Sequence, residues 1–111
     1  MLLKDAIPWF CEELNLLLVK AGESRLADQV QSLSIVDRCP CRGESCSSFY
    51  TAVMPSRGYG PGHRNVVLEP EEGMLILDVV NDVICQIEIL DREDIRLALE
   101  CSASLPTDMP R

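Results

Sequence analysis

The sequence lacks several features that would place it in a familiar functional class. No apolar run approaches the roughly 20 residues that a membrane-spanning helix needs. No basic segment precedes an apolar stretch at the N-terminus, so no secretion signal is predicted. No nucleotide-binding fingerprint, Ser/His/Asp set, pair of carboxylates, internal repeat or low-complexity run stands out. We therefore expect a cytoplasmic protein, and a non-enzymatic role is favoured over catalysis.

Basic residues are scarce. The chain has 10 Lys and Arg against 18 Asp and Glu, which gives a formal net charge of −8. This excess repels phosphate at long range, so it argues against binding to nucleic acids or to anionic membranes. The charge is uneven, because residues 38–64 carry four arginines and one acid, Glu44, whereas both flanking segments are acidic. The sequence thus indicates an acidic body with one basic loop region.

The length and the composition indicate one globular domain. A chain of 111 residues has room for a single hydrophobic core. Hydrophobic residues make up 47% and charged residues 25%, as in ordinary folded proteins. We predict one α+β domain over residues 1–101. Residues 102–111 contain two prolines and few apolar side chains, so a flexible tail is expected there.

The N-terminal segment has the apolar spacing of a helix. Hydrophobic residues recur at three- and four-residue steps over residues 3–21. Pro8 falls in the first turn of this segment, and Gly22 is suited to its end. A second, shorter helix is expected from Ser24. Together they predict a helical hairpin, and a short C-terminal helix is expected from about Asp91.

The rest of the chain has the pattern of a β-sheet. Alternating β-branched and aromatic residues predict strands over residues 34–38, 48–54, 65–69, 74–80 and 83–90. Asn81 and Asp82 both tolerate positive φ, so they predict a two-residue hairpin turn. Counting outward from that turn places Asp78 opposite Cys85 and leaves Asp78 alone on an apolar face. The predicted fold is an N-terminal helical hairpin packed on a four- to five-stranded antiparallel β-meander, with a short C-terminal helix.

Three cysteines lie close together in the basic loop region. Cys39, Cys41 and Cys46 are spaced C-x-C-x4-C, and thiolates on a turn are able to converge on one tetrahedral metal ion. His63 is the only histidine. It would return beside the cysteines if strand 48–54 paired with the strand that begins at about residue 65. A structural Zn²⁺ site with three cysteines and one histidine is therefore one prediction.

Other interpretations of these thiols stay open. They fit buried cysteines without a function. They also fit a redox pair in which Cys39 or Cys41 forms a disulfide with Cys46, since Arg38 and Arg42 would lower the thiol pKa values. A catalytic Cys46 with a histidine base is a further alternative.

The glycine-rich segment 58–64 suggests a phosphate loop, but it leads into a predicted strand and not into a helix. Arginine guanidinium groups bind carboxylate and phosphate through two hydrogen bonds at once. Together with the arginines of the basic loop region, this segment therefore predicts an anion-binding patch. These arginines are Arg38, Arg42, Arg57 and Arg64.

Parts of the sequence resemble a group of small uncharacterised bacterial proteins. The resemblance lies in R-C-x-C-x4-C-x2-F-Y-T over residues 38–51, in G-P-G-H-R over residues 60–64, and in residues 72–90. The hairpin of residues 73–90 also resembles small bacterial β-meander domains of unknown function. The resemblance implies a bacterial origin, and it brings no activity, cofactor or catalytic residue with it.

Three functions are compatible with the sequence. The first is a non-enzymatic binding module, with or without zinc, that meets a protein partner such as a basic toxin domain through its acidic surface. The second is a thiol-based redox or metal-responsive protein. The third is an enzyme that acts on a small anionic substrate at Arg42, Arg57, His63 and Arg64. No oligomeric state is predicted.

Overall fold

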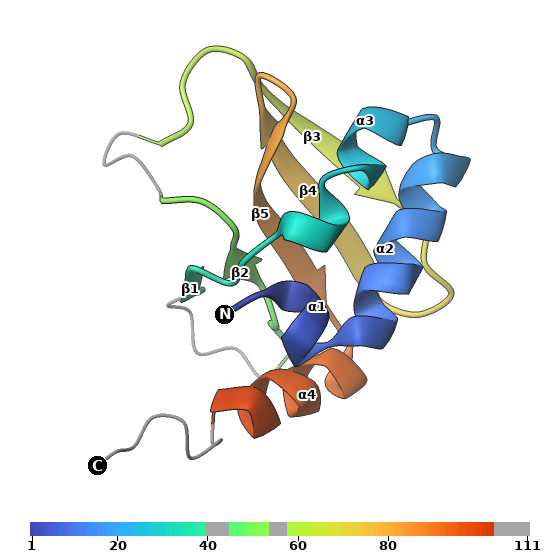
Figure 1. The fold of residues 1–111 in the computed structure, drawn as a ribbon, viewed down its shortest axis with the longest axis vertical. Helices are drawn as coiled ribbons and strands as arrows, with labels where there is room; N and C mark the ends of the chain where they lie inside the picture. Colours follow the sequence, from blue (N-terminus) through green and yellow to red (C-terminus); the bar gives the residue numbers. More distant parts are fainter. Residues whose placement is uncertain (40–44, 54–57, 104–111) are drawn as a thin grey trace.

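The computed structural model describes residues 1–39, 45–53 and 58–103. In these ranges the helices are α1 (Leu3–Ala6), α2 (Pro8–Lys20), α3 (Ser24–Ala27), the 3-10 helix η1 (Val30–Ser32) and α4 (Glu93–Ala103). The strands are β1 (Asp37–Arg38), β2 (Phe49–Tyr50), β3 (His63–Leu68), β4 (Met74–Val80) and β5 (Val83–Leu90). All strand pairs are antiparallel, in the order β1-β2-β5-β4-β3 (Figure 1). The predicted α+β fold is confirmed.

The helices gather on one face of the sheet. The N-terminal helices lie in front of the strands in Figure 1, and α4 lies beside α1 at the lower end. The core forms between this helical layer and one sheet face, because alternate residues of each strand point inward. Its largest fully buried side chains include Phe10, Leu14, Leu18, Phe49, Leu77 and Ile87. The opposite face of the sheet, here called the open face, carries none of the described helices.

The predicted N-terminal helix is interrupted. Its first turn ends at Ala6, and α2 begins at Pro8 after Ile7 leaves the helical region with φ −141° and ψ 74°. A residue before proline is disfavoured in helical geometry, which explains the break, and Pro8 then occupies the first position of α2. Gly22 follows α2 with φ +78°, as predicted for its end. None of the helices in the described ranges is long and apolar enough to cross a membrane.

The position of β2 differs from the one that the zinc prediction required. It pairs with β5, with Phe49 opposite Ile87, and not with β3. β5 is thereby bordered by β2 and β4, so among the described strands only β3, β4 and β5 form a meander. Phe49 is fully buried in this position. Burial of its ring between the helices and the central strand favours this pairing over a hairpin with β3.

The hairpin of β4 and β5 has the predicted turn, but its register is different. Asn81 and Asp82 have φ values of 49° and 65°, which confirms the two-residue turn. The register then shifts between Asp78 and Val79, so Asp78 faces Gln86 and not Cys85. This β-bulge adds one residue to β5, and a one-residue slip moves every following side chain to the other face. Ile87 and Ile89 therefore point into the core, whereas Gln86 and Glu88 join Asp78 on the open face.

The C-terminal helix extends beyond the predicted domain end. It runs through Ala103, so residues 102 and 103 of the predicted tail are helical. Residues 104–111 of that tail lie outside the described part of the chain.

Candidate functional site

A row of polar residues crosses the open face of the sheet. The register places one residue of each strand in this row: Asn65, Asp78, Gln86, Tyr50 and Asp37. Their sequence neighbours Val66, Leu77, Ile87 and Phe49 point into the core. Because side chains alternate along a strand, the polar row points away from the helices.

Asp78 lies at the centre of the site. It is only 3% exposed, and its Oδ1 accepts hydrogen bonds from His63 Nε2 and Asn65 Nδ2, each at 2.7 Å. Both donors come from β3, the neighbouring strand, and they offset part of the cost of burying a carboxylate. Its second oxygen, Oδ2, is also buried and accepts no hydrogen bond from an N–H group of the described residues. A buried carboxylate oxygen of this kind requires a donor from another source.

Glu88 supplies a second carboxyl group next to Asp78. A hydrogen bond between the two carboxyl groups raises the pKa of Glu88 to about 7, and burial and the charge of Asp78 act in the same direction. The charge of His63 acts in the opposite direction. Two adjacent carboxyl groups in a partly buried site resist double ionisation, because the second negative charge is repelled by the first. Protonated Glu88 is therefore able to donate to Asp78.

Tyr59 covers the histidine side of this cluster. Its ring stacks on His63 with 4.6 Å between the ring centroids, and its hydroxyl donates to Gln86 Oε1 at 2.6 Å. Burial and the charge of Asp78 raise the pKa of Tyr59, so the phenol keeps its proton and remains a donor. Gly58 and Gly60 on either side have positive φ, which allows the loop to turn at this point.

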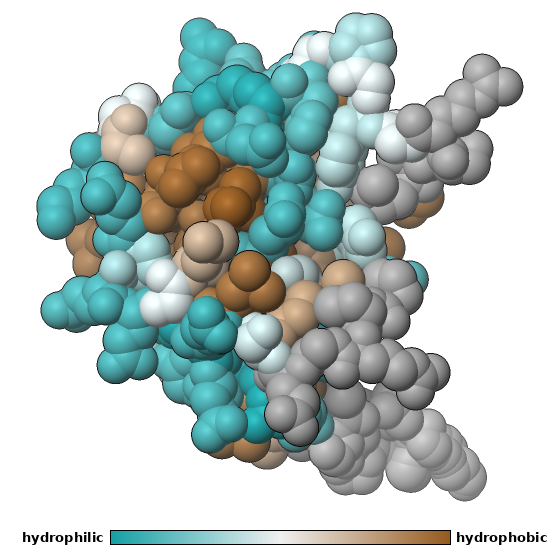
Figure 2. Space-filling model, turned by 180° about the vertical axis from the view of Figure 1, so that it is seen from behind, coloured by the Kyte–Doolittle hydropathy of each residue, from teal (hydrophilic) through white to brown (hydrophobic). Residues whose placement is uncertain are grey.

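Apolar side chains share the open face with the carboxyl pair. Val67 on β3 is 63% exposed, and Met74 and Val83 are about half exposed. Ile76, opposite Val67, is partly exposed. Figure 2 views the molecule from behind, and it shows apolar atoms gathered within a polar surround. Contiguous exposed apolar surface is typical of sites that contact another molecule.

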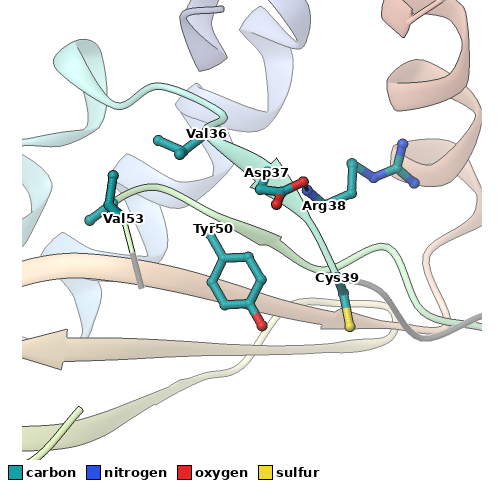
Figure 3. A pocket seen from close by; sticks show the side chains of 7 residues that line it. Val36, Asp37, Arg38, Cys39, Tyr50 and Val53 are labelled. Carbon is teal, nitrogen blue, oxygen red and sulfur yellow. Dashed lines mark hydrogen bonds between the residues drawn. The ribbon is translucent and has the colours of Figure 1, made fainter. Parts of the chain in front are cut away.

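A hollow of about 640 Å³ lies beside β1 and β2 (Figure 3). It is lined by Val36, Asp37, Arg38, Cys39, Tyr50, Ala52 and Val53. Burial raises the pKa of Tyr50, and the charges of Cys39 and Asp37 act in the same direction. Because Tyr50 also belongs to the polar row, it connects the hollow to the open face.

Two of the three predicted cysteine ligands lie near the same residue. The backbone N–H of Cys39 donates to the carbonyl of Ser48 at 3.0 Å, and Cys46 Sγ donates to Ser48 Oγ at 3.4 Å. The third, Cys41, lies outside the described residues. Ser48 itself donates to the carbonyl of Ile89, which ties this segment to β5.

The fold does not bring His63 to these cysteines. Cys46 pairs with Leu90 at one end of β5, whereas His63 faces Val80 at the other end of the hairpin. This separation is roughly 20 Å along the strands. Within the described ranges, no group of three or more His, Cys, Asp and Glu residues is able to hold a metal ion. Zinc binding by the cysteines stays a prediction, and its fourth ligand would be a residue other than His63.

The predicted anion-binding arginines are separated as well. Arg64 Nη1 and Nη2 each donate to a carboxylate oxygen of Glu23 at 3.0 Å, and Nη2 also lies 3.7 Å from Asp82 Oδ1. Its charge is thus matched by two acids of the same molecule. Arg38 lines the hollow on β1, at the opposite edge of the sheet from Arg64. Arg42 and Arg57 lie outside the described residues.

The sequence did not indicate the pairing of Asp78 with Glu88. They stand ten positions apart, and the predicted register put them on opposite faces. The available signal was the position of Asp78 on an otherwise apolar strand. Comparison with protein-family models, with curated proteins and with solved structures finds no match for this chain, so its resemblance to small uncharacterised bacterial proteins stays a prediction.

Proposed function

We propose that the protein is a non-enzymatic binding module that contacts a protein partner through the open face of its sheet. The observation that carries this proposal is the exposure of Val67, Val83 and Met74 on a face with no helical cover among the described residues. Burial of apolar surface in a complex contributes about 25 cal/mol per Å². On the open face, the exposed valines and methionine are therefore the apolar groups that contact with a partner would bury.

The net negative charge of the molecule indicates the charge of this partner. The whole chain carries a formal charge of −8, and the acids Asp82 and Glu69 flank the apolar residues at the ends of β4 and β3. A basic partner is steered towards such a surface, and an acidic partner is repelled. The expected partner is a basic protein with an apolar contact surface.

Val67→Asp is expected to weaken this interaction at least about tenfold, because it replaces an exposed apolar side chain of the contact by a charged one. Leu16→Asp is the matched control. Leu16 is 68% exposed, close to the 63% of Val67, but it lies on α2 in the helical layer. Both variants add one negative charge at an exposed apolar position.

The measurement starts with capture of partners from a bacterial lysate by the two variants and the unchanged chain. A captured partner is then purified, and its dissociation constant is measured by calorimetry at two salt concentrations. We expect loss of affinity with Val67→Asp alone and weaker binding at high salt. Equal affinities of both variants, or an acidic partner, would contradict the proposal.

A further inference from the structure

We infer that Asp78 and Glu88 share one proton in the folded sheet, and that release of this proton is a charge switch on the open face.

The hydrogen-bond geometry of Asp78 is the first argument. His63 and Asn65 both donate to Oδ1, which leaves Oδ2 buried without an N–H donor from the described residues. Hydrogen bonding of the Glu88 carboxyl group to Asp78 is the largest cause of the raised pKa of Glu88. Since a carboxyl group donates only when it is protonated, this contact requires one proton between the two residues. Oδ2 is the oxygen that remains to accept it.

The β-bulge is the second argument. It places Glu88 opposite Ile76 and Gln86 opposite Asp78, so Glu88 is a diagonal neighbour of Asp78 on the same face. Diagonal neighbours are within reach of long side chains. Without the bulge, Glu88 would point into the core.

The groups around the pair come from three strands and one loop. They are Tyr50 on β2, Tyr59 in the loop before β3, His63 and Asn65 on β3, and Cys85 and Gln86 on β5. Burial raises the pKa values of the two tyrosines and of Cys85, so these groups stay neutral around pH 7. The charge of His63 favours ionised Glu88 and opposes the charge of Asp78. Among Glu88, the tyrosines and Cys85, Glu88 is the group that titrates near neutrality.

The pH range follows from the two states of Glu88. Its pKa is raised from an ordinary value of 4.5 to about 7 in the folded protein. The folded state therefore holds the proton more tightly, and the stabilisation is complete below pH 4.5 and is lost as the pH rises to about 7. Above that pH the open face carries one more negative charge. If the proposed function holds, a basic partner binds more tightly there.

Titration of the full chain by carbon NMR tests the shared proton directly. We expect the Glu88 carboxyl signal to titrate near pH 7, and the side-chain amide signals of Asn65 to shift at the same midpoint. Asp78→Asn should lower the Glu88 midpoint towards 4.5, because the hydrogen bond to the Asp78 carboxylate and its charge are both lost while the burial of Glu88 remains. Glu71→Gln, at an exposed residue of the turn before β4, should leave it unchanged. A Glu88 midpoint near 4.5 in the unchanged chain would overturn the inference.

Glu88→Gln provides a second test that does not depend on the folding of Asp78→Asn. Its amide is able to donate to Asp78 at every pH. Between pH 5 and pH 8 the melting temperature of the unchanged chain should fall by about 5 °C relative to Glu88→Gln, and Glu71→Gln should behave like the unchanged chain. A difference that stays constant with pH would rule out the shared proton. Neither test involves a partner, so failure of the proposed function leaves this result intact.

Discussion

Replacement of Arg92 by alanine is expected to lower the free energy of unfolding by about 3 kcal/mol. Arg92 is 6% exposed and precedes α4. Its Nη1 and Nη2 donate to the two carboxylate oxygens of Glu13 at 2.7 and 2.8 Å, and its Nε and Nη2 donate to those of Asp94 at 3.0 and 3.1 Å. Loss of the guanidinium leaves both acids without their partner. Because Glu13 and Asp94 are partly exposed, water compensates for some of this loss.

The effect of Arg92 is structural, because this residue joins distant segments. Glu13 lies on α2, and Arg92 Nη1 also approaches the carbonyl of Glu72, in the turn before β4, at 3.5 Å. Arg92 also holds the pKa of Asp94 below its ordinary value. This part of the stability is present at neutral pH and is lost as the pH falls through the pKa of folded Asp94.

Arg96→Ala is the matched control for this prediction. Arg96 lies within α4, four residues after Arg92, and pairs with Glu93 and Glu100, whose side chains are more than half exposed. Exposed pairs of this kind contribute little to stability, because water screens them. The loss of stability in Arg92→Lys should fall between the losses in these two variants, because an ammonium group cannot make both bidentate contacts. Urea unfolding followed by circular dichroism at pH 7 measures all three, and equal losses for Arg92→Ala and Arg96→Ala would refute the role of Arg92.

Gly73→Ala is expected to destabilise the protein by about 3 kcal/mol, through backbone conformation and overpacking together. Gly73 precedes β4 with φ +73°. A Cβ atom there would lie 2.5 Å from the carbonyl oxygen of Leu90 and 2.6 Å from Arg92 Cγ. The carbonyl belongs to the backbone of β5 and cannot move aside without a change in the sheet.

Gly22→Ala separates these two causes. Gly22 has a similar φ of +78°, but a Cβ atom there would meet nothing within 4 Å. Its replacement should therefore cost only about 1 kcal/mol, for the conformation alone. The same urea unfolding series gives both values. Similar losses at the two glycines would mean that the turn before β4 relaxes without cost.

The two predictions are coupled through the contact of Gly73 with Arg92. In Arg92→Ala the side-chain atoms that clash with a new Cβ at residue 73 are absent. The double variant should therefore lose less stability than the sum of the single variants, as is usual for residues in contact. Strict additivity would indicate that the carbonyl of Leu90 alone accounts for the clash.

The carboxyl pair of the open face depends on one backbone irregularity. The extra residue in β5 turns Glu88 towards Asp78 and turns Ile87 and Ile89 into the core. The same shift therefore completes the hydrophobic core and creates the site. A variant that removed the bulge would bury Glu88 and expose two isoleucines.

The sequence alone determined the elements that depend on local geometry. Positive φ at Asn81 and Asp82 requires residues that tolerate it, so the turn and the strands on either side were predicted correctly. Helical spacing likewise located the N-terminal helices, although proline restricts the residue before it and so divided them at Ile7. The α+β class follows from these local patterns.

Only the tertiary structure decided which strands meet and which side chains face each other. β2 pairs with β5 because burial of Phe49 depends on residues far away in the chain, and this pairing keeps His63 away from the cysteines. The bulge at Cys85 has no glycine or proline to mark it, yet it changes the face of every residue after it. The partners of Asp78 were thus set by long-range packing, which no local pattern records.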